Sequence, residues 1–261
     1  MKTIKITLFV LTALVLGMTT SCKKDETPVE ETPVITYGTM NIELEHVWGM
    51  AESTFELNTE LYHPMTQDTL NFSMFKYYIS NFKLKKADGS YWIHPESYFL
   101  VDLSDLNSAT LNFDSIPSGT YTSLEFTLGV DSARNVSGAQ TGALAIANEM
   151  FWSWNSGYIV VRAEGTSPQS TATNNAFAFH LGGFAADNNI VTEKTIDLGS
   201  TPLTISTTKT GMIHIKVNPA KLWHASPVSV ATTNTIHMPG SSAVTMATSF
   251  YNNTFSLHHV E

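Results

Sequence analysis

Hydrophobic and polar residues alternate along several segments of this 261-residue chain, and this period of two predicts β-strands with one buried face. With this alternation, His46 and His259 are each the last residue on the apolar face of their segment, whereas His214 lies on a polar face with Lys216. The clearest segments are residues 40–46, 124–130, 177–181, 212–217 and 255–259.

Helical periodicity is scarce, and only residues 219–224 and 243–251 fit a turn or two of helix. Turn-forming pairs such as Asp88-Gly89 and Pro239-Gly240 separate the alternating segments. The pattern therefore predicts an all-β fold: a single antiparallel β-sandwich domain over residues 38–261, with long loops and one or two short helices.

The start of the chain has the pattern of a secretory signal. A short basic stretch precedes an apolar run at residues 6–18. This run has the length of the apolar part of a signal peptide and is too short for a membrane-spanning helix, which needs about 20 residues. Small residues then lead into Cys22, as in the lipobox at which bacterial lipoproteins are cleaved and lipidated. We therefore expect a lipoprotein signal peptide at residues 1–21, a lipid on Cys22, and a flexible tether to the membrane at residues 22–37.

The charged residues refine this expectation. Residues 23–26, KKDE, follow the cysteine directly and are similar to the export signal of surface lipoproteins in Bacteroidetes. The expected location is therefore the outer membrane, exposed at the cell surface. A net charge of −9, without any basic run, argues against nucleic acid as a partner, because nothing would neutralise the phosphates.

Cysteine usage limits the available chemistry. Cys22 is the single cysteine, so its lipidation would leave no thiol for a disulfide or a thiolate metal site. A metal site must then use histidine, carboxylate or methionine. The chain has no HExxH, GxSxG, P-loop or GxGxxG motif, and we therefore predict a protein that is not an enzyme. Any metal site must bring together residues that lie far apart in the sequence.

Three of the nine histidines stand out by their neighbours. His180 precedes a pair of glycines, His237 precedes a methionine thioether, and His94 points to the same side as Trp92 in an extended segment. In a separate loop, residues 131–135 supply an aspartate and an asparagine, which are oxygen ligands suited to calcium. Calcium is therefore a further candidate ion.

Residues 150–158, MFWSWNSGY, contain two tryptophans one residue apart. In a strand Trp152 and Trp154 would point the same way, about 6.5 Å from one another. Three interpretations follow: core packing, an open platform on which a lipoprotein of this kind stacks carbohydrate or another ligand, and a metal or redox site. A platform requires both indole faces to be exposed, whereas a copper site requires imidazoles that converge on one point. We expect one tryptophan to be structural, with Trp154 the closer of the two to a functional site.

Several segments together resemble a known family. Their order is YYISNFKLKKADGS (77–90), IPSGTYTSLEFTLGVDSARN (116–135), MFWSWNSGYIVVRAEG (150–165), FAFHLGG (177–183) and HMPG (237–240). They resemble the MbnP-like family, named for the methanobactin-associated copper-binding protein, and the resemblance covers most of the chain from about residue 38 onward. Its most specific part is Trp-x-Trp-x-Ser-Gly-Tyr, followed by Glu-Gly and Phe-His-x-Gly.

The resemblance implies a secreted or surface β-protein that binds copper. In methanotroph relatives a dihaem enzyme of the cytochrome c peroxidase type oxidises a tryptophan to kynurenine, and the modified residue joins histidines around the copper. By this resemblance the candidate tryptophans are Trp92, Trp152 and Trp154, and the candidate metal ligands are His46, His94, His180, His237 and His259.

Two features depart from the family pattern. Phe151 stands where such relatives often carry histidine, and no cysteine follows Phe-His-Leu-Gly. We expect His94, beside Trp92, to compensate for these losses.

Overall fold

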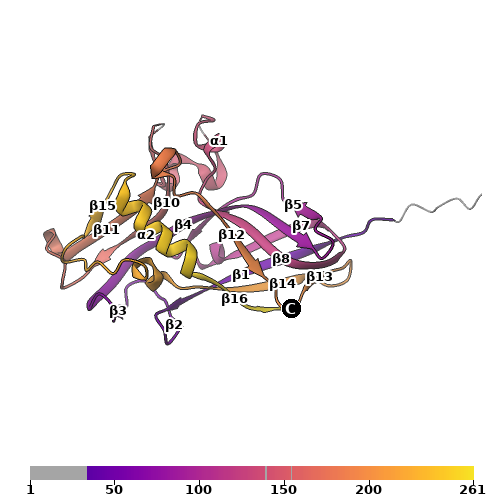
Figure 1. The fold of residues 1–261 in the computed structure, drawn as a ribbon, viewed down its shortest axis with the longest axis horizontal. Helices are drawn as coiled ribbons and strands as arrows, with labels where there is room; N and C mark the ends of the chain where they lie inside the picture. The colour runs from indigo at the N-terminus through magenta and orange to yellow at the C-terminus, as the bar shows by residue number, and fades with distance from the viewer. Residues whose placement is uncertain (1–33, 139, 154) are drawn as a thin grey trace, which may run out of the picture. The chain divides into compact units, whose positions relative to one another are not determined.

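The alternating segments form the strands of two β-sheets whose apolar faces meet in one core (Figure 1). This computed structural model describes residues 34–138, 140–153 and 155–261, so the predictions made for Cys22 and Trp154 concern residues outside the described part. Residues 35–261 form one compact unit. The predicted all-β sandwich is confirmed.

The smaller sheet has the strand order β16-β14-β1-β2, and β7 also pairs with β1. The pairs β1–β7 and β14–β16 are antiparallel, whereas β1 and β14 are parallel. A parallel pair needs a long crossover connection, and here the chain between β1 and β14 provides it. The strands are β1 (Tyr37–Trp48), β2 (Ser53–Thr54), β7 (Thr110–Pro117), β14 (Gly211–Val217) and β16 (Phe255–Val260).

The larger sheet has the order β12-β8-β4-β10-β11-β15. Further short strands join it: β13 pairs with β8, β9 pairs with β10, and β3, β5 and β6 pair with the long strand β4. The strands are β3 (Glu60–His63), β4 (Asp68–Lys86), β5 (Tyr91–Ile93), β6 (Tyr98–Asp102), β8 (Gly119–Leu128), β9 (Phe151–Ser153), β10 (Gly157–Thr166), β11 (Ala176–Gly182), β12 (Thr192–Asp197), β13 (Leu203–Ile205) and β15 (Thr235–Ile236).

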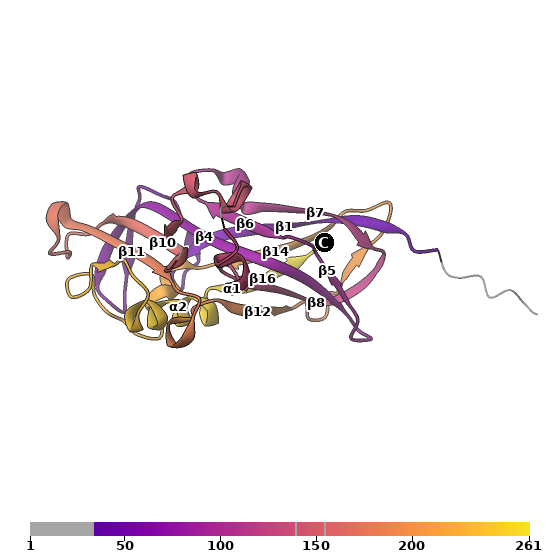
Figure 2. The ribbon, with the colours of Figure 1, turned by 90° about the horizontal axis from the view of Figure 1, so that it is seen from above.

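Helices are short, as the sequence predicts. α2 (Ser241–Asn253) contains the expected segment 243–251, and the expected turn at 219–224 is a 3₁₀-helix, Pro219–Trp223. α2 packs beside β11 (Figure 2). The remaining helices are α1 (Ser132–Asn135) and the 3₁₀ turns Leu106–Ala109, Gly142–Leu144, Ile146–Asn148, Thr173–Asn175 and Ala186–Asn188. Over the residues described, no helix is both long enough and apolar enough to cross a membrane.

The core is rich in aromatic side chains. Phe72, Phe75 and Tyr77 of β4 are fully buried, and the rings of Phe75 and Tyr77 pack against Phe250 of α2. Phe179 of β11 packs edge-on against Trp223 on the same side of the sheet. The smaller sheet, α2 and the 3₁₀ turn at 219–223 therefore cover the inner face of the larger sheet, whereas a separate, smaller cluster around Tyr78 and Tyr158 covers part of its other face.

A β-bulge near the end of β16 changes the predicted face of His259. Ile215 pairs with Leu257 and His214 pairs with His259, which leaves His258 as the extra residue. Because a bulge interrupts the period of two, His259 leaves the apolar face and lies opposite His214. The prediction that His259 closes an apolar face is therefore wrong.

Candidate functional site

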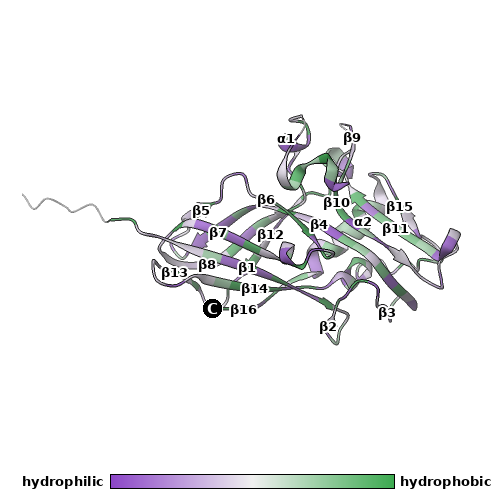
Figure 3. Cartoon of the chain, turned by 180° about the vertical axis from the view of Figure 1, so that it is seen from behind, coloured by the Kyte–Doolittle hydropathy of each residue, from purple (hydrophilic) through white to green (hydrophobic). Residues whose placement is uncertain are grey.

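The sequence segments that carry the family resemblance pack together around the start of β10 and the end of β11. Tyr78 from the first segment packs edge-on against Tyr158, and Asn135 from the second accepts a hydrogen bond from the Tyr158 backbone N–H at 2.9 Å. Figure 3 shows α1 and β9 close together beside β10. A hollow of about 110 Å³ lies between residues 155–156, residues 183–188 and Pro239.

Two glycines allow this close approach. Gly157 has a φ of 73°, and a Cβ at this position would lie 2.2 Å from Oδ1 of Asn135. A Cβ on Gly182 would lie 2.6 Å from Cζ3 of Trp152. Because larger side chains would clash, Gly182 brings the indole of Trp152 against β11, two residues from His180.

Trp152 itself has a packing role. It is half-buried and packs against a small hydrophobic cluster that is separate from the main core. This packing favours the structural and metal-site interpretations of the tryptophan pair over an open stacking platform. The cluster consists of Tyr78, Val130, Leu144, Met150, Tyr158 and Ile159.

His180 and His237 are brought together by strand register. β11 and β15 are parallel, with Ala178 opposite Thr235 and Phe179 opposite Ile236, so the same register places His237 beside His180. The two Nδ1 atoms are 3.0 Å apart, and the ring centroids are separated by 4.4 Å. The pair lies on the outer face of the larger sheet, because Phe179 faces the core.

The second nitrogen of His180 is held by a charged pair on β10. Nε2 of His180 lies 2.6 Å from Oε1 of Glu164, and Nε of Arg162 lies 2.7 Å from the same oxygen. Because the carboxylate accepts a hydrogen, Nε2 of His180 donates, and its Nδ1 keeps the lone pair that faces His237.

The surroundings set the charges of this group. Burial lowers the pKa of His180 and the neighbouring His237 lowers it further, although the hydrogen bond that His180 donates to Glu164 opposes both effects. Burial would raise the pKa of Glu164, but the hydrogen bonds from Arg162 and His180 outweigh it and the pKa is lowered. His180 is therefore neutral and Glu164 charged at neutral pH, and the arrangement can offer two imidazole nitrogens to a cation at the surface.

His46 lies elsewhere. It is on β1 in the smaller sheet and largely buried, with its Nε2 3.0 Å from the Tyr77 hydroxyl. Burial lowers the pKa of His46 to about 4, so the ring is neutral. Its side chain points into the sandwich, whereas His180 points outward from the other sheet, and the two cannot bind the same ion.

His94 and Trp92 are neighbours, as predicted, with ring centroids 5.6 Å apart. They lie far along β4 from His180. Trp92 pairs with Leu84 of β4, whereas His180 pairs with Arg162 of β10, which in turn pairs with Lys76 of β4. Eight strand residues correspond to about 26 Å. His94 therefore does not compensate for Phe151 at the His180 site.

The five candidate histidines thus do not form one site. His180 and His237 meet, whereas His46, His94 and His259 each have different neighbours, and His259 contacts His214. Sequence reasoning missed Glu164 and Arg162, although two charges alternating on one face of an otherwise apolar strand were a usable signal.

The calcium candidate at residues 131–135 has a structural role instead. Oδ1 of Asp131 caps α1 by accepting from the Arg134 N–H at 3.0 Å, and Oδ2 accepts from Asn81 and from the Tyr98 hydroxyl. Oδ1 of Asn135 accepts from the Tyr158 backbone N–H at 2.9 Å. These bonds occupy the oxygens that calcium would need.

Comparisons with known proteins agree with this fold. A comparison with curated proteins gave no match. Among solved structures, MbnP from Methylosinus trichosporium is similar, with a TM-score of 0.53 and 16% sequence identity over 80% of this chain and 87% of that chain. At this identity the likeness shows the fold alone. The family model MbnP matches residues 37–239, which is most of the sequence, and the chain therefore belongs to the MbnP family.

Proposed function

We propose that this protein binds copper at the His180–His237 pair, with Trp152 beside the site. The observation that carries the proposal is the pair of Nδ1 atoms 3.0 Å apart, with Glu164 fixing the other nitrogen of His180. Membership of the MbnP family supports copper as the metal, since the sequence resemblance links that family to copper. The role proposed is binding rather than catalysis.

The residues present fit copper. Copper(I) accepts imidazole nitrogen and thioether sulfur, and it needs no thiolate. His180 has the neutral ring that a metal ligand requires, and histidine ligands commonly donate their second N–H to a carboxylate, as His180 does to Glu164. Met238 follows His237 directly and is 70% exposed, so its thioether is a further candidate ligand.

Trp152 extends the proposal to oxidative modification. Its indole lies against Gly182 on the strand that carries His180, so a carbonyl and amine created there would add ligand atoms next to the histidines. Conversion of tryptophan to kynurenine cleaves the C2–C3 bond of the indole, places an oxygen on C3 and releases C2 as formate, with peroxide or dioxygen as the oxidant. We propose that a dihaem enzyme of the cytochrome c peroxidase type catalyses this oxidation. Trp92 and Trp154 are the other two candidates for this modification.

The proposed location follows from the N-terminal sequence. Lipid on Cys22 would anchor the protein in the outer membrane, and residues 22–37 would hold the domain away from the bilayer at the cell surface. Fractionation of the native cell tests this, because Cys22→Ala should move the protein out of the membrane fraction.

Copper binding by matched variants tests the site. The full chain is titrated with copper(I) in competition with a chromogenic chelator, for the wild type, His180→Ala, His237→Ala and Glu164→Gln. We expect loss of stoichiometric binding in the two histidine variants and a decrease of about 10–100-fold in affinity for Glu164→Gln. Two controls should bind normally: His224→Ala, an exposed histidine, and Glu149→Gln, which contacts Arg162 but is not bonded to His180.

The modification is tested by peptide mass spectrometry on protein from its own cell. Kynurenine at Trp152 would support the extended proposal, whereas kynurenine at Trp92 would move the site to His94. Unchanged copper affinity in both histidine variants would contradict the proposal.

A further inference from the structure

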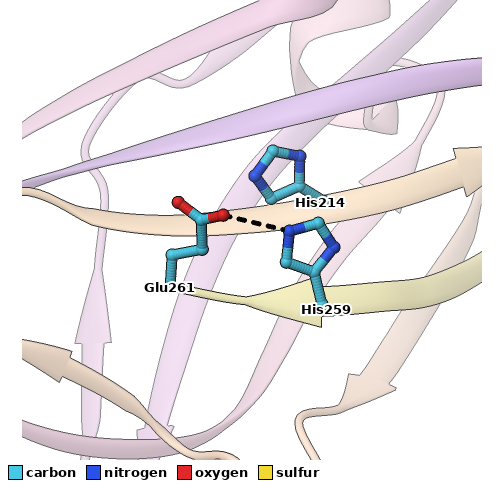
Figure 4. Close-up of side chains that lie close together, drawn as sticks. All are labelled: His214, His259 and Glu261. Carbon is cyan, nitrogen blue, oxygen red and sulfur yellow. Dashed lines mark hydrogen bonds and ion pairs between the residues drawn. The ribbon is translucent and has the colours of Figure 1, made fainter.

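A second group of metal-ligating side chains lies on the outer face of the smaller sheet. His214 of β14, His259 of β16 and Glu261 each offer one ligand atom, and these atoms lie within 4.8 Å of one another. The two imidazole rings stack 4.0 Å apart with an angle of 8° between their planes. Figure 4 shows the rings one above the other, with a nitrogen of each directed toward the side of the Glu261 carboxylate.

The two ring nitrogens of His214 have different surroundings. Its Nδ1 lies 3.3 Å from Oε2 of Glu43, so a carboxylate faces that nitrogen from the neighbouring strand. Its Nε2 is buried and has no hydrogen-bond partner among the residues described. A buried ring nitrogen without a hydrogen-bond partner lowers the stability of the fold and is uncommon in proteins, and a bound metal ion would satisfy this nitrogen.

The bulge in β16 places the second histidine. Because His258 is the extra residue, His259 is directly opposite His214, and both rings project from the outer face. The ring of His258 packs edge-on against His259 at 4.7 Å, and Nδ1 of His258 lies 2.9 Å from Oε2 of Glu45. The bulge therefore creates a histidine cluster that a regular strand would have divided between two faces.

The charges around this cluster favour a cation. Glu43, Glu45 and Glu261 each contact one of the three histidines. Lys216 lies on the same outer face, and its Nζ is 2.6 Å from Glu52, so its charge is balanced. Two imidazoles and a carboxylate suit a divalent first-row transition ion, whereas calcium and magnesium prefer oxygen ligands alone.

We infer that His214, His259 and Glu261 form a second metal site, which takes a divalent transition ion such as Zn²⁺ or Cu²⁺. Bonds of about 2.0–2.2 Å would draw the three ligand atoms together. The side chains of His259 and Glu261, which are 43% and 59% exposed, have room to move inward. The site is independent of the His180–His237 pair, which lies on the other sheet.

Titration of the full chain with Zn²⁺ by calorimetry, after removal of any histidine tag, tests this inference. We expect one equivalent of Zn²⁺ to bind the wild type, and the double variant His214→Ala/His259→Ala to lose that binding. Glu261→Gln changes only an exposed side chain, so the fold is kept, and we expect its affinity to fall about tenfold or more. His180→Ala/His237→Ala serves as the matched control and should keep the Zn²⁺ equivalent at this site.

Two results would overturn the second site. One is a His180→Ala/His237→Ala variant that binds neither Zn²⁺ nor Cu²⁺ at micromolar concentration. The other is undiminished Zn²⁺ affinity in both His214→Ala/His259→Ala and Glu261→Gln. Neither result bears on copper(I) at His180, so failure of one proposal is distinguishable from failure of the other.

Discussion

His46 illustrates how a single buried titratable residue can couple the stability of this fold to pH. The ring faces the sandwich interior beside the Tyr77 hydroxyl, and burial lowers its pKa from 6.5 to about 4. In the unfolded chain the same histidine titrates near its ordinary value. Between these two pKa values the unfolded state binds a proton that the folded state does not, so stability must fall as the pH falls.

We therefore predict that the contribution of His46 to stability is fully present above about pH 6.5 and is lost progressively toward about pH 4. The linkage is worth up to about 3 kcal/mol. His46→Gln removes the titrating group and should lose less stability than the wild type over this range, measured as the free energy of unfolding in urea. Parallel decreases in the two proteins would show that His46 is accessible to protons in the folded state.

At the scale of elements, close contact between β9 and β11 depends on Gly182. A Cβ at this position would lie 2.6 Å from Trp152 and 2.7 Å from the Tyr158 carbonyl oxygen, so neither a side chain nor the backbone can accommodate it without a shift. Gly240 is a suitable control, because a Cβ there has no atom within 4 Å and its φ of 165° is open to any residue.

We expect Gly182→Ala to displace Trp152 and to lower the free energy of unfolding by about 1–3 kcal/mol, as overpacking does. Gly240→Ala should have little effect. Urea denaturation measures the stability, and a shift of the tryptophan fluorescence of the folded protein reports the displaced indole. A stable Gly182→Ala variant with unchanged fluorescence would contradict the described packing.

The elements also show which parts of the structure were predictable. Alternation gave the correct inward residues of β1, β8, β11 and β14, since a strand with one buried face must repeat every two residues. The neighbouring rings of Trp92 and His94 followed from the same rule. These predictions depend only on local geometry.

Long-range features were not predictable in this way. One inserted residue at His258 reversed the face of His259, and no local pattern marks such a bulge. The contact between His180 and His237 depends on a parallel pairing of β11 with β15 across 57 residues of sequence. Such pairings are set by the packing of the whole domain. The sequence therefore identified candidate ligands but could not predict which of them lie close together.

For the whole molecule, the two proposed metal sites lie on different sheets of one folded unit and share no residue. A ligand that binds only the folded state stabilises it by about 2.7 kcal/mol at a hundredfold excess over its Kd. Contributions from sites without shared partners are expected to add. The domain should therefore gain stability from each metal separately.

We predict that copper(I) stabilises His214→Ala/His259→Ala as much as the wild type, and that Zn²⁺ at its specific site still stabilises His180→Ala/His237→Ala. Replacing all four histidines should abolish both effects, because the imidazole ligands of both proposed sites are then gone. Free energies of unfolding in urea, with and without each metal, measure these differences. If each pair of substitutions instead reduced the effect of both metals, the sites would be coupled through the core. The outer faces of the two sheets could then not act as separate binding surfaces.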